Sequence, residues 1–298
     1  MVTKSEEYFM SIARKEKPAW LRKKFGADPN LFLTEHILED LQLNTVCREA
    51  LCPNYAECFS KKTATFMILG VSCTRNCRFC NVVHAIPEPP DPGEPARIGA
   101  AVARLGLRYV VVTSVTRDDL PDGGAGQFAG VIAEIRRQSP ETAIEVLIPD
   151  FRGNADALRT VAAAHPDVIS HNMETVKSLY DEVRPEAEYE QSLRVVAGIK
   201  EMDAAIRSKS GIMVGLGETK AQVLSLMDDL RAADCEFITI GQYLAPSREH
   251  HEVVEYIHPD IFAEYGEIAY AKGFSFAASA PFVRSSYQAG EALDACMK

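Results

Sequence analysis

The stretch from Val71 to Asn81 reads VSCTRNCRFCN and contains three cysteines with the spacing C-x3-C-x2-C. Thiolates are ligands that iron–sulfur clusters and zinc prefer in proteins. A structural zinc site is closed by a fourth Cys or His at short range, and His84 is the nearby candidate. An iron–sulfur cluster held by only three cysteines leaves one iron open to another ligand. The stretch therefore predicts a metal centre whose fourth ligand is either a histidine or a bound molecule.

A second group of cysteines lies 14 residues upstream and also lacks a local fourth ligand. Its members are Cys47, Cys52 and Cys58, with the spacing C-x4-C-x5-C. Six of the eight cysteines thus fall within 34 residues, which favours metal sites over a disulfide framework in a chain of this size. The other two stand alone: Cys235 is expected to be a small core residue and Cys296 a thiol of the tail.

The elements that position these thiols can be predicted from the chain downstream of residue 62. Short apolar runs alternate there with amphipathic segments, and strands that are apolar on both faces indicate a parallel sheet covered by helices. The runs cover 63–71, 108–115, 143–149, 167–171, 210–216 and 237–244. The helical segments between them cover 127–138, 155–164, 192–202 and 221–233.

Six such units predict an α/β protein with a partial (β/α)6 barrel of the TIM type. We expect the barrel to cover residues 63–272. An N-terminal cysteine-rich extension covers 1–62, and a short C-terminal extension covers 273–298. Because Cys73, Cys77 and Cys80 follow the first strand directly, they should lie at the carboxyl ends of the strands, where active sites of such barrels form.

The composition excludes some classes of function. The chain has 298 residues, with 32 basic and 42 acidic side chains and a net charge of −10, which argues against a nucleic-acid-binding protein. No apolar run is long enough to span a membrane, and the first ten residues lack the apolar core of a secretory signal. We therefore expect a cytoplasmic protein that binds neither nucleic acid nor membranes.

The C-x3-C-x2-C motif after the first strand of a parallel barrel resembles the radical S-adenosylmethionine (SAM) enzymes. This resemblance implies that Cys73, Cys77 and Cys80 hold three irons of a catalytic [4Fe–4S] cluster, and that SAM chelates the fourth iron. An electron passed into the cluster would then cleave SAM and release a 5′-deoxyadenosyl radical. Such a radical removes hydrogen from unactivated C–H bonds, while the protein orients the reactants and excludes water.

Other segments are similar to the SAM-binding parts of these enzymes. GIMVGLGE (Gly211–Glu218) resembles the G-x-I-x-G-x-x-E pattern, in which glycines let the backbone approach adenine, and it implies roles for Gly215 and Glu218. SHNMET (170–175) offers Asn172 and Glu174 as further SAM contacts. The Gly-Gly-Glu that usually follows the second strand is absent, since Ser114-Val115-Thr116-Arg117 stands there.

The upstream triad and a third motif, RSSYQAG (Arg284–Gly290), are similar to lipoyl synthases in particular. In that family Cys47, Cys52 and Cys58 would hold an auxiliary [4Fe–4S] cluster, and a serine of the RSSY motif would bind its fourth iron. By position we expect Ser286 to be this ligand, with Ser285 as the rival. An alkoxide is a harder ligand than a thiolate, so a serine-held iron should be easier to lose. The family is thought to consume this cluster as its sulfur source.

The resemblance also implies a reaction and its partners. Two SAM molecules would be cleaved in succession, and sulfur would be inserted at C6 and C8 of an octanoyl group attached to a lysine of a lipoyl carrier domain. Carriers of this kind are glycine-cleavage H protein and the E2 subunits of 2-oxoacid dehydrogenases, and flavodoxin or ferredoxin would supply electrons. The basic stretch with Lys15, Lys17, Arg22, Lys23 and Lys24 is either a docking site for an acidic carrier or a solvated helix face.

Two other classes of function remain open at this point. A methylthiotransferase or a biotin synthase would also insert sulfur. The first should carry a basic RNA-binding appendage, and the second should lack the upstream triad. A non-catalytic iron–sulfur electron carrier would need fully ligated clusters and no barrel of this size.

Overall fold

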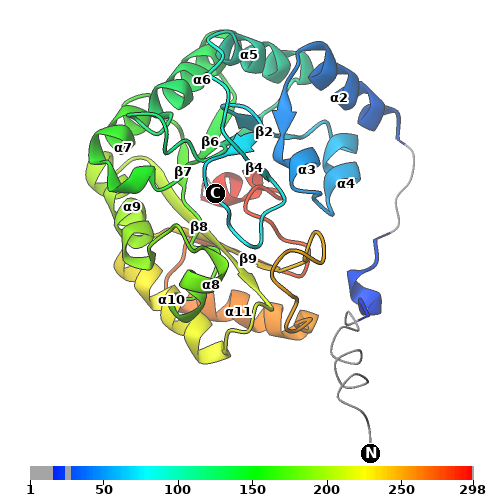
Figure 1. Ribbon diagram of the computed structural model, residues 1–298, viewed down its shortest axis with the longest axis vertical. Helices are drawn as coiled ribbons and strands as arrows, with labels where there is room; N and C mark the ends of the chain where they lie inside the picture. Colours follow the sequence, from blue (N-terminus) through cyan, green and yellow to red (C-terminus); the bar gives the residue numbers. More distant parts are fainter. Residues whose placement is uncertain (1–15, 24–27, 297–298) are drawn as a thin grey trace, which may run out of the picture.

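The computed structural model describes residues 16–23 and 28–296, and its central feature is an eight-stranded sheet curved into an incomplete barrel (Figure 1). The strand order is β1-β2-β5-β6-β7-β8-β9-β10, and neighbours from β2 to β10 pair in parallel. The strands are β1 (Asn44–Thr45), β2 (Thr65–Ile68), β5 (Tyr109–Ser114), β6 (Ala143–Leu147), β7 (Val168–Ser170), β8 (Arg207–Val214), β9 (Phe237–Gln242) and β10 (Phe276–Ser279). All six predicted strands are present, as β2 and β5 to β9. The predicted partial barrel is confirmed.

Helices form the outer ring of the barrel, as Figure 1 shows. Each has an apolar side toward the sheet: α6, for example, buries Phe128, Val131, Ile132 and Ile135. The ring consists of α5 (Glu94–Leu105), α6 (Ala125–Gln138), α7 (Ala155–Ala162), α9 (Tyr189–Met202), α10 (Lys220–Ala232) and α11 (Pro259–Ala271). In residues 16–23 and 28–296, no helix combines the length and the apolar character that crossing a bilayer requires.

The segments before and after the barrel extend the same sheet at its two edges. β1 pairs antiparallel with β2, and β10 pairs parallel with β9. The N-terminal part also contributes the short helices that surround the first cysteine group, and the chain ends in a helix near the barrel axis (Figure 1). These helices are α2 (Pro29–Asp40), α3 (Val46–Glu49), α4 (Tyr55–Ser60) and α12 (Gly290–Cys296).

A buried ion pair lies near the amino-terminal ends of the barrel strands. Lys209 Nζ is 2.8 Å from both carboxylate oxygens of Glu145, and the Tyr109 hydroxyl donates a 2.6 Å hydrogen bond to the same group. At the same end Gly290, the first residue of α12, packs against Tyr109. A buried pair with these hydrogen bonds is satisfied but contributes little net stability. It occupies the end of the barrel opposite the carboxyl ends of the strands.

Candidate active site: two cysteine triads around one cavity

A cavity of about 460 Å³ lies at the carboxyl ends of the barrel strands. All six clustered cysteines line it, together with the tail residues Arg284, Ser285, Ser286 and Tyr287. Each of the cysteines is a free thiol. The structure therefore brings together three motifs that lie far apart in the sequence, which is the arrangement expected for two clusters that act on one substrate.

The loop with the C-x3-C-x2-C cysteines, Cys73, Cys77 and Cys80, follows β2 and is fixed by backbone hydrogen bonds. These cysteines are the second triad in chain order, and Cys47, Cys52 and Cys58 are the first. Cys73 lies in β3 (Ser72–Cys73), and its Sγ accepts hydrogen bonds from the backbone N–H groups of Thr116 (3.3 Å) and Arg75 (3.5 Å). Cys80 donates its N–H to the carbonyl of Cys77 at 3.0 Å. Hydrogen bonds to ligand sulfurs are one of the means by which a protein sets the potential of an iron–sulfur cluster.

His84, the candidate for closing a zinc site, is exposed and does not line the cavity. It lies in β4 (Val83–His84), where its backbone pairs with Cys73. Among the described residues, no three His, Cys, Asp or Glu side chains are placed to hold a single metal ion. The position of His84 outside the cavity does not favour it as a fourth ligand for these cysteines.

Arg75, between Cys73 and Cys77, ties this loop to two others through its guanidinium. It donates to Asp118 at 2.7 and 3.0 Å and to Asp150 at 2.7 and 2.9 Å. The Arg75 and Asp150 side chains are 5% and 0% exposed. Burial opposes ionisation of Asp150, but the hydrogen bonds and charge of Arg75 outweigh it, so the pKa of Asp150 lies below its ordinary value. The network fixes the position of the cysteine loop over the barrel.

In the segment after β7, three buried side chains that line the cavity have polar atoms without a partner among the described residues. These atoms are His171 Nε2, Asn172 Oδ1 and Arg184 Nε, and all three residues line the cavity. Unpaired buried polar atoms are rare, and at a cavity wall they are suited to a ligand. Two are acceptors and one is a donor, which fits the ammonium, hydroxyl and carboxylate groups that SAM presents.

The acceptor role of His171 follows from its surroundings. Its Nδ1 is 2.9 Å from the carbonyl oxygen of Ile148, which can only accept, so Nδ1 carries the proton. Burial lowers the pKa of His171 to about 4, so the ring is neutral at physiological pH and Nε2 keeps its lone pair.

Asn172 and Glu174, two of the expected SAM contacts, both line the cavity. The Asn172 amide donates to Glu174 Oε1 at 2.9 Å and to the Ser285 hydroxyl at 2.8 Å. Glu174 has a φ of 65°, which is strained for a residue with a side chain, and backbone hydrogen bonds to Gly211 and Met213 hold it there. Burial raises the pKa of its carboxyl. Asn172 thus links Glu174 to the tail motif.

Gly215 and Glu218, the other two expected SAM contacts, lie outside the residues that line the cavity. The Glu218 carboxylate accepts the N–H groups of Gly215 (2.6 Å) and Leu216 (2.9 Å) and so stabilises its own turn. A side chain at position 215 would collide with Gln242 and with the carbonyl of Glu255. These contacts explain the motif structurally, and its role in SAM binding stays a prediction.

The first triad lies on the N-terminal side of the cavity. Cys47 is in α3, Cys58 is in α4, and Cys52 is in the loop between them, with its N–H bonded to the Cys47 carbonyl at 3.2 Å. Burial raises the pKa of Cys47 to about 11 and that of Cys58 to about 12, so in the metal-free chain these thiols hold their protons until a metal displaces them. Their position fits a buried cluster.

One contact joins the two cysteine segments, and another holds the tail motif against the barrel. Asn81, directly after Cys80, donates to the carbonyl of Glu49 at 2.7 Å, which joins the two cysteine loops. On the tail side, a Cβ on Gly241 in β9 would lie 2.0 Å from the Val283 carbonyl oxygen. Only glycine at 241 lets the tail approach the strand this closely.

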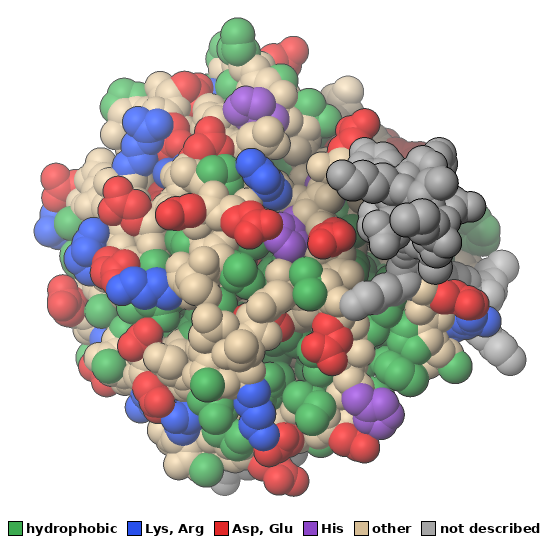
Figure 2. Space-filling view, turned by 60° about the horizontal axis from the view of Figure 1, so that its bottom comes forward, with side chains coloured by type: hydrophobic (Ala, Val, Ile, Leu, Met, Phe, Trp, Pro, Cys, Tyr) green, Lys and Arg blue, Asp and Glu red, His purple; other side chains and the backbone are tan. Residues whose placement is uncertain are grey.

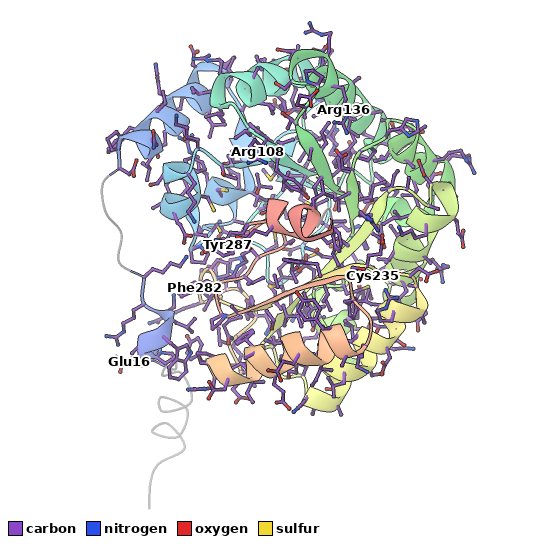
Figure 3. All side chains as sticks on the ribbon, turned by 180° about the vertical axis from the view of Figure 1, so that it is seen from behind. Glu16, Arg108, Arg136, Cys235, Phe282 and Tyr287 are labelled. Atoms are coloured by element: carbon purple, nitrogen blue, oxygen red, sulfur yellow. The ribbon has the colours of Figure 1, made fainter. Side chains whose placement is uncertain are left out.

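Sequence reasoning missed the roles of Arg75, His171 and Arg184. Arg75 and His171 lie within quoted motifs, but their partners are not local. Arg184 donates to the carbonyls of Asn172 and Met173 and to the Tyr180 hydroxyl. Its segment, DEVRPE, contains no pattern that indicates this role. Of the solitary cysteines, Cys235 (labelled in Figure 3) is a core residue as expected and does not line the cavity, and the Cys296 side chain lies outside the described residues.

Comparison with solved structures supports the fold. Streptococcus suis SuiB bound to S-adenosylmethionine matches with a TM-score of 0.56 and 11% identity, covering 76% of this chain and 54% of SuiB. Methylornithine synthase (PylB) matches with a TM-score of 0.54 and 12% identity, covering 88% and 86% of the two chains. At this identity the likeness concerns the fold alone.

Comparison at the sequence level goes further. Residues 67–230 match the model of the radical SAM superfamily. A lipoyl synthase of Alkaliphilus metalliredigens is 56% identical over 94% of this chain and 97% of its own length. A lipoyl synthase of Geobacter metallireducens is 52% identical over 94% and 98% of the two chains. With both triads and the RSSY motif around one cavity, the chain belongs to the lipoyl synthase family of the radical SAM superfamily.

Proposed function

We propose that this chain uses two [4Fe–4S] clusters and SAM to insert sulfur at C6 and C8 of an octanoyl group on a lipoyl carrier domain. The observation that carries the proposal is the single cavity lined by both cysteine triads and the RSSY motif. Residues 1–62 would supply the auxiliary triad, 63–272 the barrel, and 273–298 the serine ligand. When bound, the catalytic cluster and SAM supply a hydrogen-abstracting radical, and the auxiliary cluster supplies sulfur.

In this proposal one side of the cavity holds the catalytic cluster and SAM. Cys73, Cys77 and Cys80 hold the catalytic cluster. The unpaired atoms of His171, Asn172 and Arg184, together with Glu174, orient SAM. Gly215 and Glu218 shape the turn at the end of β8 and contribute to SAM binding from there. The protein thus binds and orients SAM on the wall that faces the first triad.

The octanoyl chain requires an apolar surface between the two triads. Met67, Leu147, Ile148, Met213 and Leu244 line the cavity and can provide it. Burying an alkyl chain stabilises binding by roughly 0.8 kcal/mol per methylene. An apolar wall also keeps water away from a reactive carbon. We propose that these side chains hold C6 and C8 within reach of both cofactors.

The carrier would be glycine-cleavage H protein or an E2 lipoyl domain, and the electron donor flavodoxin or ferredoxin. On the face shown in Figure 2, acidic and basic side chains are interspersed rather than gathered in one patch. Of the basic stretch proposed for docking, Lys15 and Lys24 lie outside the described residues, and Arg22 pairs with Glu16 at 2.9 Å. Lys23 binds Asn54 and Glu57, so the exposed Lys17 and Arg22 are the better candidates for a docking contact.

Ser286 is the proposed fourth ligand of the auxiliary cluster. The Ser285 hydroxyl is engaged by Asn172, whereas no hydrogen bond of the Ser286 hydroxyl occurs within the described part of the chain. Ser286→Ala should therefore lower the number of sulfur atoms inserted per chain at least tenfold, and Ser285→Ala should have a smaller effect on it, because a serine ligand cannot be replaced by a methyl group. Mass spectrometry of the product measures this number. The reverse order of effects would assign the ligand to Ser285.

The proposed function is tested by anaerobic reconstitution followed by turnover on an octanoylated carrier peptide. Two clusters require about eight irons per chain. Incubation with SAM and a strong reductant should give a peptide with two added sulfurs, as seen by mass spectrometry. Four irons per chain, or SAM cleavage without added sulfur, would contradict the proposal.

A further inference from the structure

Lys23 is a charged residue of the N-terminal segment that points inward. Its Nζ is 2.5 Å from Asn54 Oδ1 and 2.8 Å from Glu57 Oε2. The same ammonium lies over two aromatic rings, 4.6 Å from the centroid of Phe282 and 5.4 Å from that of Tyr287. The Lys23 side chain is 20% exposed. One ammonium thus contacts two segments of the chain that are more than 200 residues apart.

The two segments also bind each other directly. The Asn54 amide donates to the Phe282 carbonyl at 2.7 Å, and the Tyr287 hydroxyl donates to Glu57 Oε1 at 2.8 Å. Asn54 is almost fully buried. We call Lys23, Asn54, Glu57, Phe282 and Tyr287 the seam cluster. Phe282 and Tyr287 are labelled in Figure 3, where they lie beside the N-terminal segment.

The residues of the seam cluster lie next to the proposed ligands of the auxiliary cluster in the sequence. Asn54 and Glu57 lie between Cys52 and Cys58, in the segment that supplies the auxiliary triad. Phe282 and Tyr287 flank Ser285 and Ser286. The first segment follows β1 and the second follows β10, and β1 and β10 are the two edges of the sheet. The seam cluster therefore connects the two edges at the place where the cysteine and serine ligands must meet.

We propose that Lys23 is a positioning residue for the auxiliary cluster, which holds the tail with Ser286 against the segment with Cys47, Cys52 and Cys58. The inference rests on the proposed function, because it presumes that this cluster exists. An oxygen ligand binds a cluster iron more weakly than a thiolate does, so its placement decides how long the iron stays. A charge-assisted hydrogen bond and two cation–π contacts from one side chain supply that placement.

The test compares Lys23→Met with Lys61→Met. Lys61 also binds Glu57, at 3.0 Å, but its side chain is 57% exposed and no hydrogen bond or ion pair joins it to the tail in the described residues. Both variants remove one ammonium from the same carboxylate, and only Lys23→Met removes the contacts to Phe282 and Tyr287. The two reconstituted proteins and the wild type are treated with an iron chelator, and iron release is followed over time.

Lys23→Met should release about four irons roughly tenfold faster than the wild type, while Lys61→Met should match the wild type. Hydrogen–deuterium exchange of the metal-free full-length chain gives a second readout. Peptides covering 281–288 should exchange faster in Lys23→Met than in Lys61→Met. Unchanged iron release together with unchanged exchange would mean that Lys23 only anchors the N-terminal segment, and would overturn the inference. A wild type that binds only four irons would overturn the proposed function instead.

Circular dichroism shows whether Lys23→Met folds. If it does not fold, the same iron-release experiment is carried out with Tyr287→Phe. This change removes the hydroxyl that Glu57 binds and keeps the ring. Faster release of four irons from Tyr287→Phe, with native circular dichroism, supports the role of the seam cluster. Release at the wild-type rate overturns it.

Discussion

Replacing Cys47, Cys52 and Cys58 together with alanine is expected to leave reductive SAM cleavage within about twofold of the wild type and to abolish sulfur insertion. The reason is the division of the cavity into two walls. The cysteines proposed to hold the catalytic cluster lie on one side with the unpaired atoms of His171, Asn172 and Arg184. None of these groups depends on the first triad for a hydrogen bond that the structure shows. Deoxyadenosine release and the mass of the carrier peptide measure the two activities separately.

A substitution in the other cysteine triad distinguishes this prediction from a general loss of structure. Cys77→Ala should abolish both activities, because hydrogen abstraction must precede sulfur attack. Cys235→Ala is the matched control: this buried cysteine belongs to the barrel core, and its loss should leave both activities unchanged. Sulfur insertion by the triple variant at more than a few per cent of the wild-type rate would mean that the sulfur comes from elsewhere. The assignment of the auxiliary cluster would then be wrong.

The barrel could be predicted from the sequence because its strands are apolar on both faces. The six runs correspond to β2 and β5 to β9, and the helices between them follow their apolar periodicity. The edge strands could not be predicted in the same way. β1 has two residues, and β10 reads Phe-Ala-Ala-Ser, so neither has enough apolar pattern to be recognised as a strand. Their pairing depends on the neighbouring strand, which is a tertiary effect.

The site could be predicted as a set of motifs but not as an arrangement. The cysteines and the RSSY motif are recognisable because their residue types and spacing are rare. That they surround one cavity depends on contacts such as Asn54–Phe282, which join residues 228 positions apart. Local patterns contain no information on such pairs. The same limit explains Lys23, which resembles an exposed docking residue in the sequence and is a half-buried contact between the two sheet edges in the structure.

Replacing Arg75 with methionine is expected to lower the free energy of unfolding by about 3–5 kcal/mol at pH 7, because it leaves Asp150 buried without a counter-charge. The cysteine loop should also lose its attachment to the loops after β5 and β6, so the variant should bind about four irons fewer than the wild type. Urea denaturation of the metal-free chain and iron analysis after reconstitution measure the two effects. Arg152→Met is the control, since Arg152 is 71% exposed and pairs with Asp118 at 3.2 Å, and it should cost less than about 1 kcal/mol.

The pH dependence distinguishes a lost charge pair from lost packing in Arg75→Met. In the wild type the pKa of Asp150 lies below its ordinary value, so its contribution to stability is present above about pH 4 and is lost as the pH falls further. Without Arg75, burial dominates and the pKa of Asp150 should rise above its ordinary value. The variant should then lose stability as the pH rises from about 4 to 7, and the difference from the wild type should shrink toward pH 4. A difference that stays constant over this range would show that Arg75 acts through its packing, and that the ion pairs do not fix the cysteine loop.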